Sequence, residues 1–270
     1  MSRWQKLRRK LFPRRPVRAR AIQTLAGVAS PQLGNARNVT VYLPPSYDGS
    51  NRRYPVVYMQ DGQNLFDRAT SHAGDWGLVD RLDALAAAGI EAIVVGVWNA
   101  GDARLTEYSP FVDPTHGGGA GDRYIAFLVE TLKPLIDGRF PTRSDAAATG
   151  IAGSSMGGLI SLGAYFSQPS VFGFAAVMSP SLWFADAAAL PFVERSPKPA
   201  GPLYVDIGCR EGQRALADVR RLRDLLVAKG YRHGVDLLYE EDSTGEHNEA
   251  AWGRRFPRAL AFLLGQRSRA

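Results

Sequence analysis

Cysteine is nearly absent from this 270-residue chain. The single cysteine, Cys209, cannot form a disulfide within the chain, which excludes a small secreted scaffold held together by disulfides. No apolar run approaches the roughly 18 residues that a membrane-spanning helix needs. Arginines also interrupt the N-terminus where a signal peptide requires an apolar stretch. These absences predict a soluble protein of a reducing compartment, and we expect a cytoplasmic location.

Histidine is scarce as well, with four residues in the chain, and none has metal-ligand spacing to a second histidine or acid. We therefore expect no metal and no cofactor.

Excess charge is absent from most of the sequence. Nine of the 33 basic residues lie within residues 1–20, which contain no acid, so 24 basic and 26 acidic residues remain beyond them. A basic surface with interleaved aromatics does not stand out there, which argues against a nucleic-acid partner.

The basic segment is predicted to be a tail, residues 1–25, that precedes one folded domain, residues 26–270. Two interpretations of the tail are open. The composition favours a solvated, disordered segment. Trp4, Leu7, Leu11 and Phe12 nevertheless have helical spacing among the cations, which is typical of an amphipathic helix on anionic lipid. In that second interpretation residues 1–20 provide weak contact with a membrane surface.

Apolar segments rich in β-branched residues alternate with segments of helical periodicity along the domain. The predicted strands are residues 38–43, 55–59, 92–97, 147–152, 175–178, 203–207 and 235–239. The predicted helices are residues 76–88, 124–137, 156–166, 214–229 and 249–264. Proline-rich stretches, including 191–202, are predicted loops. This alternation predicts an α/β protein whose mostly parallel central sheet is covered on both faces, with no large lid domain.

The motif Gly153-Ser154-Ser155-Met156-Gly157 has the Gly-x-Ser-x-Gly pattern and lies between a predicted strand and a predicted helix. This context is typical of a nucleophilic serine on a strained turn, where glycines let neighbouring backbones approach. The registration of the two glycines selects Ser155 over Ser154. The Met156 N–H, at the start of the helix, is a candidate oxyanion donor. The alternative interpretation is a glycine-rich turn that binds phosphate or merely packs.

Where a nucleophilic serine lies on such a turn, the chain order is serine, then acid, then histidine, so the general base must follow Ser155. This leaves His233 and His247. His233 lies in a predicted surface turn between a helix and a strand. His247 follows that strand and precedes the last helix, where a loop can reach Ser155. We therefore predict His247 as the base.

Two carboxylates are candidates for the acid that orients the base. Asp206 lies inside an apolar run, and it would be buried within a strand. Glu211 lies in the loop that follows the same strand, at the edge of the sheet where the other candidates gather. We favour Glu211, although it can also serve as an acid at the start of the next helix.

Three segments carry a family resemblance: residues 58–67 (YMQDGQNLFD), 153–158 (GSSMGG) and 247–252 (HNEAAW). They resemble the putative-esterase family of α/β-hydrolases, whose relatives include feruloyl esterases, enterochelin esterases, S-formylglutathione hydrolase and mycolyltransferases. The resemblance covers roughly residues 35–265. It implies an α/β-hydrolase catalytic domain that hydrolyses esters or transfers acyl groups without a cofactor. It also implies the triad Ser155, Glu211 and His247.

The same resemblance makes the segment Asp61-Gly62-Gln63 a second oxyanion element, with the Gln63 N–H opposite that of Met156. Two convergent donors suit the charge that develops on a carbonyl oxygen during acyl transfer. The sequence departs from many relatives at Gln60, where they carry histidine. This departure concerns substrate contacts near Gln60.

Polar and aromatic residues follow the predicted strand ends, where ligands bind in open α/β sheets. The residues that we expect to contact substrate are Asp61, Asn64, Trp76, Trp98, Asn99 and Trp183. The tryptophans could instead pack loops onto the core, which is the commoner use of an aromatic side chain.

These features predict a serine esterase that forms an acyl-enzyme on Ser155 from a small-molecule carboxylic ester. Two alternatives are an acyltransferase with the same triad and a non-catalytic binding protein built on the hydrolase fold. The presence of all three triad residues argues against the second alternative.

Overall fold

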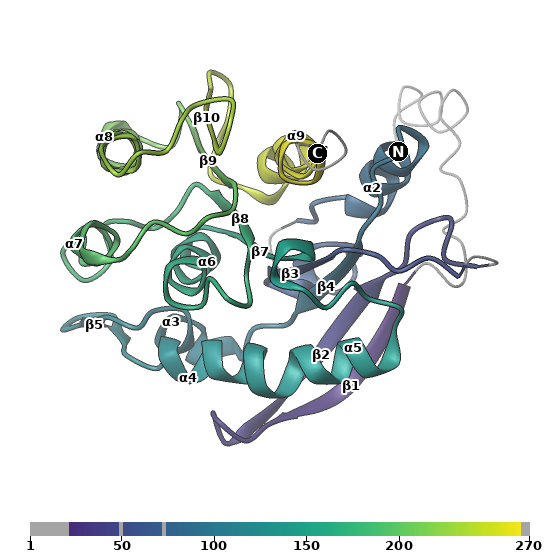
Figure 1. The fold of residues 1–270 in the computed structure, drawn as a ribbon. Helices are drawn as coiled ribbons and strands as arrows, with labels where there is room; N and C mark the ends of the chain where they lie inside the picture. The colour runs from purple at the N-terminus through teal and green to yellow at the C-terminus, as the bar shows by residue number, and fades with distance from the viewer. Residues whose placement is uncertain (1–21, 49–50, 72–73, 266–270) are drawn as a thin grey trace, which may run out of the picture.

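The computed structural model describes residues 22–48, 51–71 and 74–265. Within them, eight strands form one sheet in the order β1-β2-β4-β3-β7-β8-β9-β10 (Figure 1). Their bounds are β1 Ile22–Ser30, β2 Asn35–Tyr42, β3 Val56–Gln60, β4 Ile93–Val97, β7 Thr149–Ser154, β8 Phe174–Met178, β9 Leu203–Gly208 and β10 Leu237–Asp242. The pair β1–β2 and the pair β2–β4 are antiparallel, and the six strands from β4 to β10 run parallel.

Helices connect the parallel strands and cover both faces of the sheet. Both faces carry apolar side chains to be covered, because successive side chains of a strand point to opposite faces. On β3, Val56 and Tyr58 face one buried cluster, whereas Val57 and Met59 face the other. The first cluster includes residues of α4 (Gly121–Ala126), η3 (Phe127–Leu132), α5 (Lys133–Arg139), α6 (Met156–Ser167), α7 (Ala189–Arg195) and α8 (Gln213–Ala228). The second includes residues of α2 (Leu78–Ala87) and α9 (Glu249–Gly265), which lie together in Figure 1.

Short elements complete the described chain. They are η1 (Gly62–Asn64), η2 (Gly101–Ala103), α3 (Arg104–Glu107), η4 (Ala146–Ala148) and the small hairpin of β5 (Val112–Asp113) with β6 (Gly117–Gly118). In the part of the chain that the structure describes, no helix is both long and apolar enough to cross a bilayer.

The predicted fold class is confirmed, and each predicted strand and helix overlaps an observed element. Besides the short elements named above, β1 and α7 are additional. Strand β1 was not predicted, and because it begins at Ile22, residues 22–25 belong to the sheet rather than to the predicted tail. Helix α7 lies partly in the stretch 191–202 that was expected to be a loop. Pro191 is compatible with it, because the N–H groups of a first helical turn have no partner within the helix.

The parallel strands all end at one edge of the sheet, and the candidate residues follow these ends. Asp61 follows β3, Ser155 follows β7, and Ser179 follows β8. Glu211 lies three residues after β9, and His247 lies between β10 and α9. The topology thus gathers residues that are distant in sequence at the edge where open α/β sheets bind ligands.

Candidate active site

Ser155 occupies a strained turn between β7 and α6. Its backbone has φ 58° and ψ −125°, which is costly for a residue with a side chain. The flanking glycines leave no space for one: a Cβ on Gly153 would lie 2.5 Å from the Gly157 carbonyl oxygen. A Cβ on Gly157 would lie 2.8 Å from Cβ of Gln60. The close packing around the turn therefore requires glycine at both positions.

The side chains of Ser155, His247 and Glu211 form a continuous hydrogen-bonded chain. His247 Nε2 lies 3.0 Å from Ser155 Oγ, and His247 Nδ1 lies 2.7 Å from Glu211 Oε2. The imidazole is 46% exposed, whereas the Glu211 side chain is 1% exposed. A buried carboxylate at one end and an accessible hydroxyl at the other is the arrangement of an activated serine nucleophile.

The second oxygen of Glu211 is also bound. Oε1 accepts hydrogen bonds from Ser179 Oγ at 2.6 Å and from the Gly208 N–H at 2.8 Å. Burial alone would raise the pKa of Glu211, but the hydrogen bonds from His247 and Ser179 outweigh it, and the pKa is lower than usual. The lowered pKa keeps the carboxylate of Glu211 ionised near neutral pH.

Asp206, the other acid considered from the sequence, has a different set of contacts. It is fully buried in β9, where it receives two hydrogen bonds from Arg255 at 2.8 and 3.1 Å and one from Tyr204 Oη at 2.9 Å. Burial raises the pKa of Asp206 to about 6, against the effect of Arg255. Of the two acids, Glu211 is the one that is hydrogen-bonded to His247.

The segment after β3 carries the second candidate oxyanion donor, the Gln63 N–H of η1. A Cβ on Gly62 would lie 2.3 Å from backbone atoms of Gly96, so η1 packs directly on β4. Asp61 precedes η1 with φ 55°. Its carboxylate binds Arg104 through two hydrogen bonds of 2.7 and 2.8 Å and Asn99 Nδ2 at 2.7 Å. These bonds hold η1 in place beside Ser155.

Two cavities open at this edge of the sheet, and His247 lines both. The first, about 360 Å³, is lined by Asp61, Gln63, Asn64, Trp76, Asn99, Arg104, Ser154, Ser155, His247, Glu249 and Trp252. The second, about 400 Å³, is lined by Ser179, Pro180, Ser181, Trp183, Glu211, Gly212, Gln213, Arg214, Ala215, Asp218 and His247. Two cavities that share His247 suit a substrate with two parts joined at a reacting bond.

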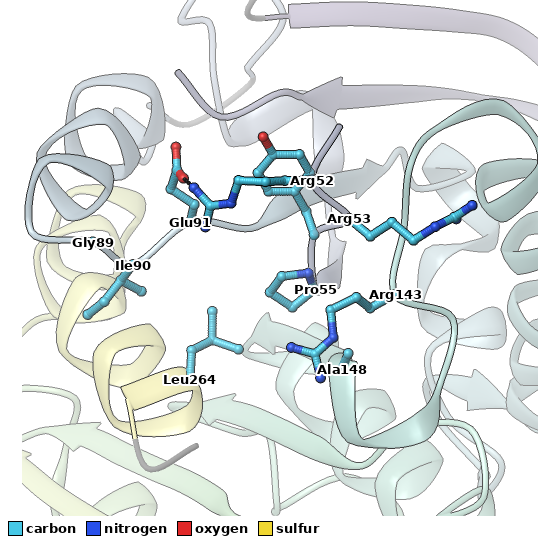
Figure 2. Close-up of a pocket in the computed structure, with 10 residues that line it drawn as sticks. Arg52, Arg53, Pro55, Gly89, Ile90, Glu91, Arg143, Ala148 and Leu264 are labelled. Atoms are coloured by element: carbon cyan, nitrogen blue, oxygen red, sulfur yellow. Dashed lines mark hydrogen bonds and ion pairs between the residues drawn. The ribbon is translucent and has the colours of Figure 1, made fainter. Parts of the chain in front are cut away.

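A third cavity, about 200 Å³, lies at the opposite edge of the sheet, where β3, β4 and β7 begin (Figure 2). Arg52 and Glu91 at its wall are paired at 2.7 Å. The Arg143 side chain extends toward the space between Ala148 and Leu264 in Figure 2. None of the residues predicted for the active site lines this cavity.

A family model described as "Putative esterase" matches residues 30–263. The chain belongs to this family. It is a carboxylic ester hydrolase of the α/β-hydrolase fold, and the resemblance inferred from the three sequence motifs is confirmed.

Three comparisons place this esterase among its relatives. It is 28% identical to "Uncharacterized protein YbbA" of Bacillus subtilis, over 90% of this chain and 98% of that protein. It is 27% identical to an endo-1,4-beta-xylanase/feruloyl esterase of Xylanibacter ruminicola, over 83% of this chain and 29% of that protein. The enterobactin esterase of Shigella flexneri, solved with enterobactin, shares the fold at a TM-score of 0.72 and 19% identity, over 93% of this chain and 60% of that one.

The residues expected to contact substrate separate into three groups in the esterase. Asp61, Asn64, Trp76 and Asn99 line the first cavity, and Trp183 lines the second. Trp76 also packs on Trp252 and Phe256, each at 6.0 Å between ring centroids. Trp98 lines neither cavity. Its Nε1 donates a hydrogen bond to Thr40 Oγ1 at 2.9 Å. Gln60 is buried and accepts a hydrogen bond from Tyr124 Oη, so it lies beneath the site.

Several contacts around the triad were not predicted from the sequence. Ser181 Oγ lies 3.2 Å from Ser155 Oγ, and the rings of Trp252 and His247 are nearly perpendicular, with 4.8 Å between their centroids. Arg255 contacts Ser179, whose hydroxyl in turn contacts Glu211. Trp252 belongs to a motif that carried the resemblance, but an arginine on the last helix gives no sequence signal of its own. The proposed tail contact with membranes concerns residues 1–20, which lie outside the described residues.

Proposed function

We propose that the esterase acts through an acyl-enzyme on Ser155, with His247 as general base and Glu211 as the acid that orients it. The observation that carries this proposal is the chain of two hydrogen bonds, 3.0 and 2.7 Å, from Ser155 Oγ through His247 to Glu211 Oε2. It begins at the strained turn that exposes the serine and ends at a buried, ionised carboxylate. These positions support the three proposed roles.

In the first half of the reaction, His247 Nε2 takes the Ser155 proton while Oγ bonds to the ester carbonyl carbon. The carbonyl oxygen becomes an oxyanion, and the Met156 and Gln63 N–H groups are the proposed donors to it. The positive end of α6 adds to this stabilisation. The intermediate collapses, the C–O bond to the alcohol breaks, and the imidazolium returns the proton to the leaving alcohol.

In the second half, His247 removes a proton from water, and the hydroxide formed attacks the acyl carbon. The bond to Ser155 Oγ breaks, the serine recovers its proton from the imidazolium, and the carboxylic acid leaves. Two cavities that share His247 provide places for the acyl and alcohol parts of a small-molecule ester. Feruloyl and siderophore esters, the substrates in the names of relatives, are two candidate classes.

The test compares wild type with Ser155→Ala on p-nitrophenyl acetate, butyrate and octanoate. We expect the substitution to lower kcat by roughly 10⁴-fold or more, because the nucleophile is lost, and to leave the melting temperature within a few degrees of wild type. A folded Ser155→Ala protein with wild-type turnover would refute the acyl-enzyme proposal.

A matched pair of histidine variants tests the base. His247→Gln should lose activity to a similar extent, whereas His233→Gln should retain it. His233 is exposed at the turn before β10, at the opposite end of that strand from His247. Equal activity in the two variants would remove His247 from the mechanism.

A further inference from the structure

Arg255, on the buried side of α9, is close to two carboxylates of the site. Its Nε and Nη2 bind Asp206 at 2.8 and 3.1 Å, and Nη2 lies 3.6 Å from Glu211 Oε1. The Arg255 side chain is only 7% exposed, and those of Asp206 and Glu211 are at most 1% exposed. Two buried carboxylates therefore share one buried cation. Buried charges of this kind persist only where they are paired.

Ser179 joins this ion pair to the triad. Its hydroxyl donates to Glu211 Oε1 at 2.6 Å and accepts from Arg255 Nη2 at 2.8 Å and from Trp252 Nε1 at 3.0 Å. With two donors directed at it, the hydroxyl has its own proton available only for Glu211. The direction of the Ser179–Glu211 hydrogen bond is thus fixed by its neighbours.

The backbone of Ser179 is held as firmly as its side chain. Its N–H donates to both the main-chain oxygen and Oδ1 of Asp206, at 3.0 and 3.1 Å. Its φ is 40°, in the left-handed region that residues with a side chain adopt at a cost. The surrounding bonds keep Ser179 in this conformation, which places its hydroxyl beside Glu211.

From this arrangement we infer that Arg255 is a positioning residue of the esterase, acting through Ser179 to hold one oxygen of Glu211 so that the other faces His247. The inference rests on the proposed triad. Arg255 touches neither the reacting atoms nor His247, so it acts by fixing the orientation and the charge of Glu211. A misplacement of a catalytic group by about 1 Å can cost about 100-fold in rate.

Other titratable and charged groups lie around Arg255 and beside His247, and they contribute to the expected pH dependence. Asp206, Tyr204 and Asp242 face Arg255 from β9 and β10, with Asp242 Oδ2 at 3.7 Å from Nη1. Glu249, Arg214 and Asp218 line the cavities beside His247. The active form needs Glu211 ionised and His247 neutral. Loss of the Arg255 charge makes the potential around the Glu211–His247 pair more negative, so the acid limb of the pH profile should move to higher pH.

The experiment measures kcat, KM and the pH profile of kcat/KM for Ser179→Ala, Arg255→Gln and Arg255→Lys. Stoichiometric labelling of Ser155 with a phosphonate corrects each rate for the fraction of competent protein. We expect Ser179→Ala and Arg255→Gln to lower the corrected kcat by roughly 10- to 100-fold with KM little changed. Arg255→Lys keeps the charge without the planar fork, so it should recover part of the loss.

The pH profile separates positioning from a purely structural role. Arg255→Gln should shift the acid limb upward by a few tenths of a unit to about one unit, since buried Asp206 takes up a proton and offsets part of the lost charge. Arg258→Gln is the matched control. Arg258 lies on the same helix and also pairs with a carboxylate, that of Glu240, but the Arg258 side chain is 69% exposed. It should keep the wild-type kcat and profile.

Two results would overturn the inference. One is a wild-type corrected kcat and pH profile in both Ser179→Ala and Arg255→Gln, which would show that the network only stabilises the fold. The other is an equal effect of Arg258→Gln. If Arg255→Gln does not fold, Ser179→Ala and Arg255→Lys decide the question. Failure of the triad is distinguished by Ser155→Ala, which would then remain active whatever the result at Arg255.

Discussion

Two hydrogen bonds join Ser155, His247 and Glu211, the three side chains of the proposed triad. The sequence predicted these three residues, because strand-end position and motif spacing restrict the candidates. It did not reveal that Ser179 and Arg255 bind the far side of Glu211, because such contacts depend on how α9 packs against β8 and β9. Asp61 shows the same limit: its position after β3 was predictable, but its pairing with Arg104 was not.

At the residue scale, Glu211→Gln keeps the size of the side chain but removes its charge. The amide cannot hold His247 in the tautomer that accepts the Ser155 proton, nor stabilise the imidazolium. We expect kcat to fall by roughly 10³- to 10⁴-fold while KM changes little. Steady-state kinetics on p-nitrophenyl butyrate, with circular dichroism to verify folding, provide the measurement. A loss of less than tenfold would mean that Glu211 is not the acid of the triad.

At the scale of elements, the turn between β7 and α6 combines tight packing with a strained serine. The strand, turn and helix were predictable, because an apolar run, two glycines and a helical pattern follow one another in the sequence. Strand β1 was not: its nine residues, IQTLAGVAS, include Gly27 and have two buried positions, Leu25 and Ser30, so they lack a buried-strand pattern. It pairs with the next strand, β2, in an antiparallel hairpin whose register shifts between Leu25 and Val28, and such a shift interrupts the alternation that marks a strand.

Two glycines of α6 provide a test of this packing. Gly157→Ala would bring a Cβ within 2.8 Å of Gln60, whereas a Cβ on Gly163 meets nothing within 4 Å. Both substitutions gain about 1 kcal/mol of helix propensity. We therefore expect Gly163→Ala to raise the free energy of unfolding by up to about 1 kcal/mol and Gly157→Ala to lower it by roughly 1–3 kcal/mol. Urea denaturation measures both, and equal stabilities would contradict the tight turn.

At the scale of the whole molecule, the excess positive charge lies N-terminal to the described sheet. All strands of the described sheet, and all residues of the proposed site, lie at Ile22 or beyond. Nine basic residues precede that point and account for the net charge of +7, since the remainder carries 24 basic and 26 acidic residues. The alternation of strand and helix patterns predicted the domain, whereas the composition and spacing of residues 1–20 leave two interpretations of the tail open.

Removal of residues 1–20 should therefore leave kcat/KM on p-nitrophenyl butyrate and the melting temperature unchanged, while it abolishes attraction to anionic lipid. We expect the full chain to sediment with phosphatidylserine vesicles at low salt, and to be released at 0.5 M NaCl, because each cation near such a surface contributes about 1 kcal/mol and salt screens it. Phosphatidylcholine vesicles serve as the neutral control. Equal sedimentation of the full and shortened chains would place any lipid contact on the folded domain, and a shortened chain with reduced kcat/KM would show that the tail contributes to the esterase itself.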